Sequence, residues 1–64
     1  MTQHERENWL INIENEADTI SSELGPEVVE GVLRGYGVSC AEEADDCDLQ
    51  DIFSELFAYE ADLL

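Results

Sequence analysis

The sequence contains no lysine, and Arg6 and Arg34 are its only strongly basic side chains. Against them stand 17 aspartates and glutamates, which give a formal net charge of -15. Proteins that bind nucleic acids or anionic membranes neutralise phosphate groups with clusters of lysine and arginine. The scarcity of positive charge therefore excludes direct nucleic-acid binding and docking to a membrane surface. It favours a basic protein as partner, although the same charge also keeps a small protein soluble without any partner.

Metal-binding residues are scarce as well. Histidine occurs once, as His4, and cysteine twice, as Cys40 and Cys47. A structural zinc site needs four cysteine or histidine ligands, so we expect no zinc. The acidic stretch 45–51 lacks the glycine and the final glutamate of a calcium-binding EF-hand loop. We expect neither metal nor cofactor, and two free thiols, with a disulfide between the cysteines as the alternative.

The sequence holds no recognisable catalytic set. No cysteine lies near His4 in the sequence, and lysine is absent. Paired carboxylates act as acid and base only where a pocket removes one of them from water. A chain of 64 residues has little volume for such a pocket. We therefore expect a protein that is not an enzyme.

No apolar run reaches the length of a membrane-spanning helix. The N-terminal residues Met1–Arg6 are not followed by the apolar core of a signal peptide. These features predict a cytoplasmic protein whose thiols are reduced. The length predicts one domain over residues 1–64, and the hydrophobic content of 44% is typical of a globular chain.

Helical periodicity organises most of the chain. A first amphipathic helix is expected over Glu5–Leu24, followed by Gly25 and Pro26, which favour a helix end and a new start. A second helix is expected over Pro26–Arg34.

Between the second and third helices, Ser39 and Glu42 have the spacing of a capping box and predict a short helical turn over residues 40–44. A third helix is expected over Asp48–Leu63, with Asp48 as its N-cap. Together these patterns predict an all-α bundle of three main helices with a short fourth turn.

Apolar residues of the three helices define the expected core. The side chains expected to be buried together are Trp9, Ile13, Ile20, Val32, Phe53 and Leu56. Leu63 and Leu64 extend the apolar face of the third helix. Glu60 falls within that face, and we expect it to be exposed near the C-terminus, with pairing to Arg6 or Arg34 as the alternative.

Two acidic stripes are the candidate partner-binding surface. They consist of Glu7, Glu14 and Asp18 on the first helix and Asp51, Glu55 and Asp62 on the third. Residues four apart on a helix are separated by about 6 Å along its axis, close to the spacing of phosphates on a nucleic-acid strand. The stripes predict a protein-interaction module, in one form a nucleic-acid-mimicking inhibitor or regulator of a basic protein. The simpler interpretation is that an amphipathic helix places its acids in water.

The alternative function is structural. The apolar residues are numerous for one small core, so some of them could form a dimer interface in a self-associating protein. Salt separates the two hypotheses, because it weakens charge-driven binding and leaves apolar association intact. The sequence therefore leaves monomer and homodimer open.

Residues 31–64 carry a family resemblance. Tyr36-Gly37-Val38 leads through an acidic stretch to Ile52-Phe53-Ser54-Glu55-Leu56-Phe57. Over these residues the chain resembles small acidic helical proteins of bacterial mobile elements. The resemblance implies a bacterial cytoplasmic setting and no activity, and it transfers no functional residue.

Overall fold

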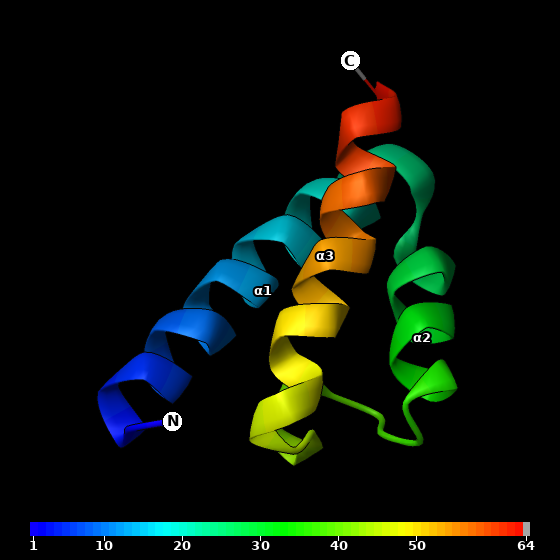
Figure 1. Ribbon diagram of the computed structural model, residues 1–64. Coiled ribbons are helices and arrows are strands. Elements are labelled where there is room, and N and C mark those ends of the chain that lie inside the picture. The colour runs from blue at the N-terminus through cyan, green and yellow to red at the C-terminus, as the bar shows by residue number, and fades with distance from the viewer. Residues whose placement is uncertain (64) are drawn as a thin grey trace.

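The computed structural model describes residues 1–63, with side chains up to residue 62. Its elements are helix α1 (Gln3–Leu24), helix α2 (Pro26–Gly35), the 3-10 turn η1 (Ala41–Glu43) and helix α3 (Asp46–Leu63). The three helices run up, down and up, and the loop that holds η1 closes one end of the bundle (Figure 1). The predicted all-α bundle with a short fourth turn is confirmed.

Helix α1 begins two residues before the predicted start at Glu5, because Thr2 caps it. The Thr2 hydroxyl accepts a hydrogen bond from the Glu5 backbone N–H at 3.1 Å, and Glu5 Oε1 accepts one from the Thr2 backbone N–H at 3.4 Å. This reciprocal capping box satisfies two backbone donors that a helix start otherwise leaves unpaired.

The corner between α1 and α2 follows the predicted stop and restart. Gly25 has a φ of 96°, a conformation that costs a residue with a side chain but is open to glycine. Pro26 then occupies the first turn of α2, where its missing N–H is not needed. The two helices can therefore fold back on each other with a single linking residue.

Helix α2 ends in a Schellman motif. The Gly37 N–H donates to the Arg34 carbonyl at 2.9 Å, and the Val38 N–H donates to the Leu33 carbonyl at 3.2 Å. Gly37 supplies the positive φ of 77° that this ending requires. Val38 and Leu33 both contribute to the apolar cluster, so the motif also turns the chain towards the core.

The segment before α3 differs from the sequence prediction. The predicted Ser39–Glu42 capping box is absent; the Ser39 hydroxyl instead donates to the Glu43 side chain at 2.5 Å. The helical turn is the short 3-10 element η1. Helix α3 starts at Asp46 and not after Asp48, whose N–H already donates to the Asp45 carbonyl at 2.9 Å.

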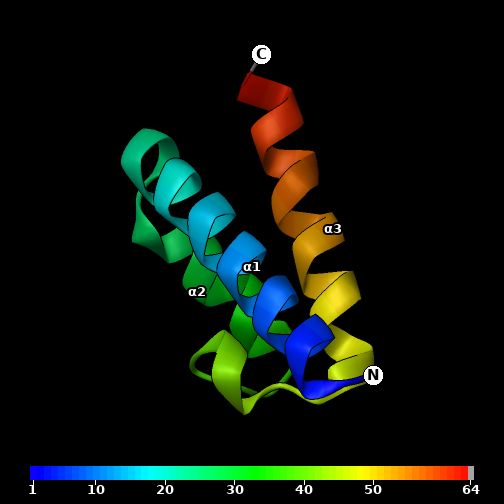
Figure 2. The same ribbon diagram turned by 90° about the vertical axis from the view of Figure 1, so that its left-hand side faces the viewer.

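The core lies where α1 meets both other helices and η1. The buried apolar side chains are Ile13, Ile20, Val32, Leu33, Ala41, Ala44, Leu49, Ile52 and Leu56. No polar or charged residue is buried among the residues described. Helix α1 packs closely on α3 and α2, whereas α2 and α3 touch only sparsely. Figure 2 shows α1 running beside α3 and diverging from it towards the C-terminus of α3.

Four of the six predicted core residues are buried, but Trp9 and Phe53 are only half-buried. Their rings meet edge to face at 5.6 Å, at the rim of the α1–α3 interface. The fully enclosed positions of α3 are Leu49, Ile52 and Leu56, because that side of α3 faces α1 and α2 together. The predicted apolar positions Leu63 and Leu64 lie outside the side chains described.

Candidate functional site

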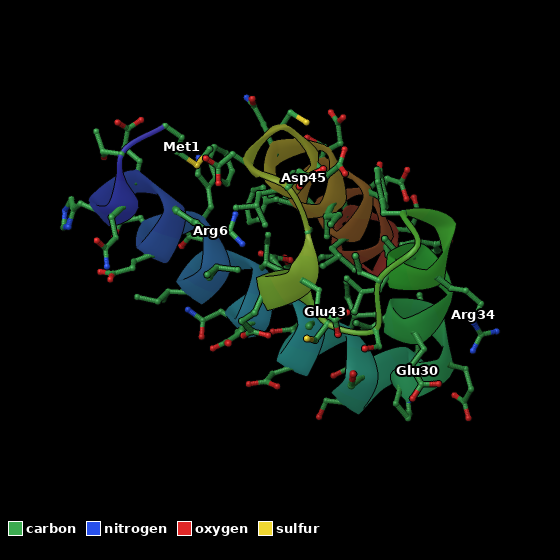
Figure 3. The ribbon with its side chains drawn as sticks, turned by 90° about the horizontal axis from the view of Figure 1, so that it is seen from below. Met1, Arg6, Glu30, Arg34, Glu43 and Asp45 are labelled. Atoms are coloured by element: carbon green, nitrogen blue, oxygen red, sulfur yellow. The ribbon has the colours of Figure 1, made fainter. Side chains whose placement is uncertain are left out.

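Arg6 ties the start of α1 to the segment that leads into α3. Its Nη1 lies 2.6 Å from Asp46 Oδ1, and its Nη2 donates to the carbonyl oxygens of Glu42 and Ala44, both at 2.9 Å. Figure 3 shows Arg6 reaching towards the loop at Asp45, while Arg34 extends from α2 on the far side. Arg6 is thus bonded within the fold, and its positive charge is not available to the acidic stripes.

Arg6→Gln is expected to lower the free energy of unfolding by about 1–2 kcal/mol. Hydrogen bonds to a charged group stabilise by about 1.5–3 kcal/mol, and partial exposure reduces that value. The matched control is Arg34→Gln, which removes the same charge from an exposed site on α2 and should cost less than about 0.5 kcal/mol. Urea unfolding followed by circular dichroism measures both. Equal losses would mean that net charge, and not the bonds of Arg6, determines the effect.

The first predicted stripe is exposed along α1 and continues onto η1. Glu7, Glu14 and Asp18 are all solvent-accessible. Glu14 faces Glu42 of η1, and a hydrogen bond between the two carboxyl groups, with their repulsion, raises the pKa of Glu14. The same bond lowers the pKa of Glu42. The negative surface here therefore extends beyond the residues that the sequence pattern selected.

The second predicted stripe lies on the side of α3 that turns towards α2. Asp51, Glu55 and Asp62 are exposed. The Tyr36 hydroxyl, at the end of α2, donates to Glu55 Oε1 at 3.0 Å. Burial, this hydrogen bond and the nearby negative charge of Glu55 and Asp51 raise the pKa of Tyr36. An aromatic side chain is thereby held beside the acidic stripe.

Helix α2 separates the two stripes. Glu14 borders a hollow that Val29 and Leu33 line from one side of α2. Glu55 borders another hollow, with Val28 and Val32 on a different side of α2. The structure therefore keeps each stripe together along its own helix but does not join the two into one continuous surface.

An open groove of about 620 Å³ runs between α2 and α3. Val28 and Val32 form apolar lining, and Gly31 and Gly35 leave α2 without side chains along one edge. At its margins lie two tyrosines, Tyr36 and Tyr59, and two carboxylates, Glu27 and Glu55. The sequence pattern did not reveal this groove, although the spacing of the two glycines by four residues was a visible signal.

Glu16 and Glu60 form a second feature that the sequence pattern missed. They approach each other between α1 and α3, and both are half-buried. Removal from water, the hydrogen bond with Glu60 and repulsion by Glu60 raise the pKa of Glu16 to about 7. Its Oε2 atom is buried without a hydrogen-bond partner among the residues described. Glu60 is thus neither exposed nor paired with an arginine. Its position within the apolar face of the predicted third helix was the sequence signal for this burial.

The cysteines are free thiols. Cys40 is half-buried and Cys47 is exposed. Cys40 Sγ donates to Glu43 Oε1 at 3.3 Å, and hydrogen bonding to Glu43 and Glu42, followed by burial, raises the pKa of the thiol. A raised pKa leaves less of the reactive thiolate at neutral pH. Cys40 therefore links the start of η1 to Glu43 through its thiol.

Within the described part of the chain, no three histidine, cysteine or acidic side chains gather in a way that could hold a metal ion. No helix in that part is long and apolar enough to cross a membrane. The sequence matches no protein-family model, and no curated protein or solved structure matches it.

Proposed function

We propose that this chain is a small acidic interaction module that binds a basic protein. The observation that carries the proposal is the uncompensated charge: 17 acidic residues face two arginines, and Arg6 is bonded within the fold. Both acidic stripes are exposed, and exposed carboxylates of one sign attract a positively charged partner over long range. A nucleic-acid-mimicking inhibitor or regulator of a basic protein is one form of this role.

A binding role accounts for the chain better than catalysis. His4 is exposed in the first turn of α1, and the Cys40 thiol bonds to Glu43. The polar groups that the surface offers to a partner are therefore chiefly carboxylates, and Tyr36 and Tyr59 lie beside two of them, Glu27 and Glu55. The proposed setting is the bacterial cytoplasm, in keeping with two free thiols.

Self-association is the second candidate, and one observation favours it. Phe57 is 54% exposed although its ring stacks on Phe53 at 6.2 Å. A second copy could cover this rim of the α1–α3 interface. However, the other large exposed apolar residues, among them Ile11 and Leu24 on α1, are dispersed, and two copies repel each other through their equal charge.

The two candidates respond to salt in opposite ways. Immobilised chain should retain basic proteins from a native cell extract at about 0.02 M sodium chloride and release them at about 0.5 M, because salt screens exposed charges. A control chain with Glu7→Gln, Glu14→Gln, Glu55→Gln and Asp51→Asn should retain far less. Sedimentation of the free chain should show a monomer in both salts. A dimer strengthened by salt and lost on Phe57→Ser, with no retained basic protein, would favour self-association instead.

A further inference from the structure

The groove between α2 and α3 contains two helical glycines that the fold itself does not require. Neither Gly31 nor Gly35 has a positive φ, and a Cβ atom added at either would meet no atom within 4 Å. Glycine within a helix is less favourable than alanine by about 0.5–1 kcal/mol. The glycines thus leave open space along the groove without any gain in stability within the chain.

The groove offers apolar and anionic contacts side by side. Val28 is a half-buried apolar residue in its lining, and Val32, which is 7% exposed, lies at its base. Glu27 and Glu55 lie at its margins, and Asp62 borders an adjoining hollow with Tyr59 on α3. Tyrosine faces attract arginine and lysine, and carboxylates pair with them. The complement of this surface is an apolar stripe flanked by positive charges.

The shape of the groove favours a helix as its occupant. It follows α2 from Glu27 to Gly35, which are eight residues or about 12 Å apart along the axis. Two helices that touch sparsely leave a furrow into which a third can pack, and glycines allow close approach of its backbone. A second copy of this chain is a poor occupant, because each copy carries a charge of -15.

We propose that the groove between α2 and α3 is the docking site for a basic amphipathic helix of the partner protein. Its apolar side would cover Val28 over the glycines, and its arginines or lysines would reach Glu27, Glu55 and the two tyrosines. This inference rests on the proposed function, and it places the partner on the α3 stripe and not on the α1 stripe.

The experiment uses the full chain and a synthetic amphipathic peptide of about 14 residues, four helical turns, with leucines on one side and arginines on the other. A control peptide carries glutamates in place of the arginines. The chain has only four glycines, and their amide NMR signals report on the site. The arginine peptide should shift the signals of Gly31 and Gly35 more than the signal of Gly37, which does not line the groove.

Filling the groove should weaken binding of the peptide without harming the fold. Gly31→Leu with Gly35→Leu should weaken the arginine peptide about tenfold or more, while the melting temperature stays equal or rises because leucine favours the helix. Ser22→Leu adds the same side chain to an exposed site on α1 and should leave affinity within about twofold. If the variant with Gly31→Leu and Gly35→Leu does not fold, two charge variants test instead whether the peptide binds in the groove.

Two charge variants of equal net charge locate the contact. Glu27→Gln with Glu55→Gln should weaken binding about tenfold, whereas Glu7→Gln with Asp18→Asn on the α1 stripe should weaken it about twofold. If both charge variants lose the same affinity, or if the peptide shifts NMR signals other than those of Gly31 and Gly35, the groove is not the docking site. The proposed function would still stand. If the peptide does not bind but the chain still retains basic proteins from the extract, the docking site is likewise wrong and the proposed function still stands. Absence of both kinds of binding would overturn both.

Discussion

Leu56→Ala is expected to lower the free energy of unfolding by about 2–5 kcal/mol, the usual cost of removing a buried leucine side chain. Leu56 is fully buried on α3, with Ile52 and Leu49 beside it on the same face. A domain of 64 residues has a small reserve of stability, so a loss of this size should leave much of the chain unfolded at room temperature. Loss of the helical circular dichroism signal and a lowered urea midpoint measure it.

Phe57→Ala is the matched control, because it removes a larger side chain one residue away. Phe57 is 54% exposed, so its loss should cost less than about 1 kcal/mol. Phe53→Ala should fall between the two, since Phe53 is half-buried against Trp9. A larger loss for Phe57 than for Leu56 would show that α3 is rotated about its axis relative to the structure described.

Acid and salt are each expected to raise the melting temperature from its value at pH 8 in low salt. The pKa of Glu16 rises from 4.5 to about 7 in the fold, because burial and Glu60 disfavour its charge. Between pH 4.5 and 7 the folded chain therefore binds more protons than the unfolded chain, so stability increases as pH falls through this window. The raised pKa of Glu14 acts in the same direction.

Two other carboxyl groups limit the gain on the acid side. Hydrogen bonds from Glu14 to Glu42, and from Ser39 and Cys40 to Glu43, lower the pKa values of these glutamates. Their contribution is present above the ordinary pKa of 4.5 and is lost as the pH falls below it. Stability should therefore be greatest near about pH 5. Added salt stabilises at pH 8 because about 0.1 M screens exposed charges beyond about 10 Å.

Glu16→Gln isolates the largest of these effects. At pH 8 it should raise the free energy of unfolding by about 1 kcal/mol, a value reduced for the partial exposure of Glu16. At pH 4 the gain should be nearly lost, because the carboxyl group is then neutral in the folded state and mostly neutral in the unfolded state. Glu23→Gln, on the exposed surface of the same helix, removes the same charge without touching Glu60 and is the control. A gain for Glu16→Gln that does not depend on pH, or one matched by Glu23→Gln, would contradict the assigned carboxyl pair.

Local chemistry in the sequence determined the fold class and most helix boundaries. Gly25 and Pro26 end one helix and begin the next because of their own backbone preferences, independently of what packs around them. Apolar spacing on α1 placed Ile13 and Ile20 in the core, since a helix has one side to bury. The structure starts α3 two residues before the predicted position, at the point where Arg6, forty positions away, binds Asp46 and the carbonyl groups before it.

Only the tertiary structure decided how the surfaces lie. The sequence selected the acids of both stripes, since helical periodicity places them outside, but it could not place α2 between them. Nor could it show that α2 and α3 touch sparsely, which turns Gly31 and Gly35 into one edge of a groove. The sequence predicted an exposed Glu60, whereas in the structure it lies half-buried beside Glu16 of α1. Periodicity assigns a side chain to one side of its own helix, whereas its neighbours depend on how the helices are rotated and spaced against one another.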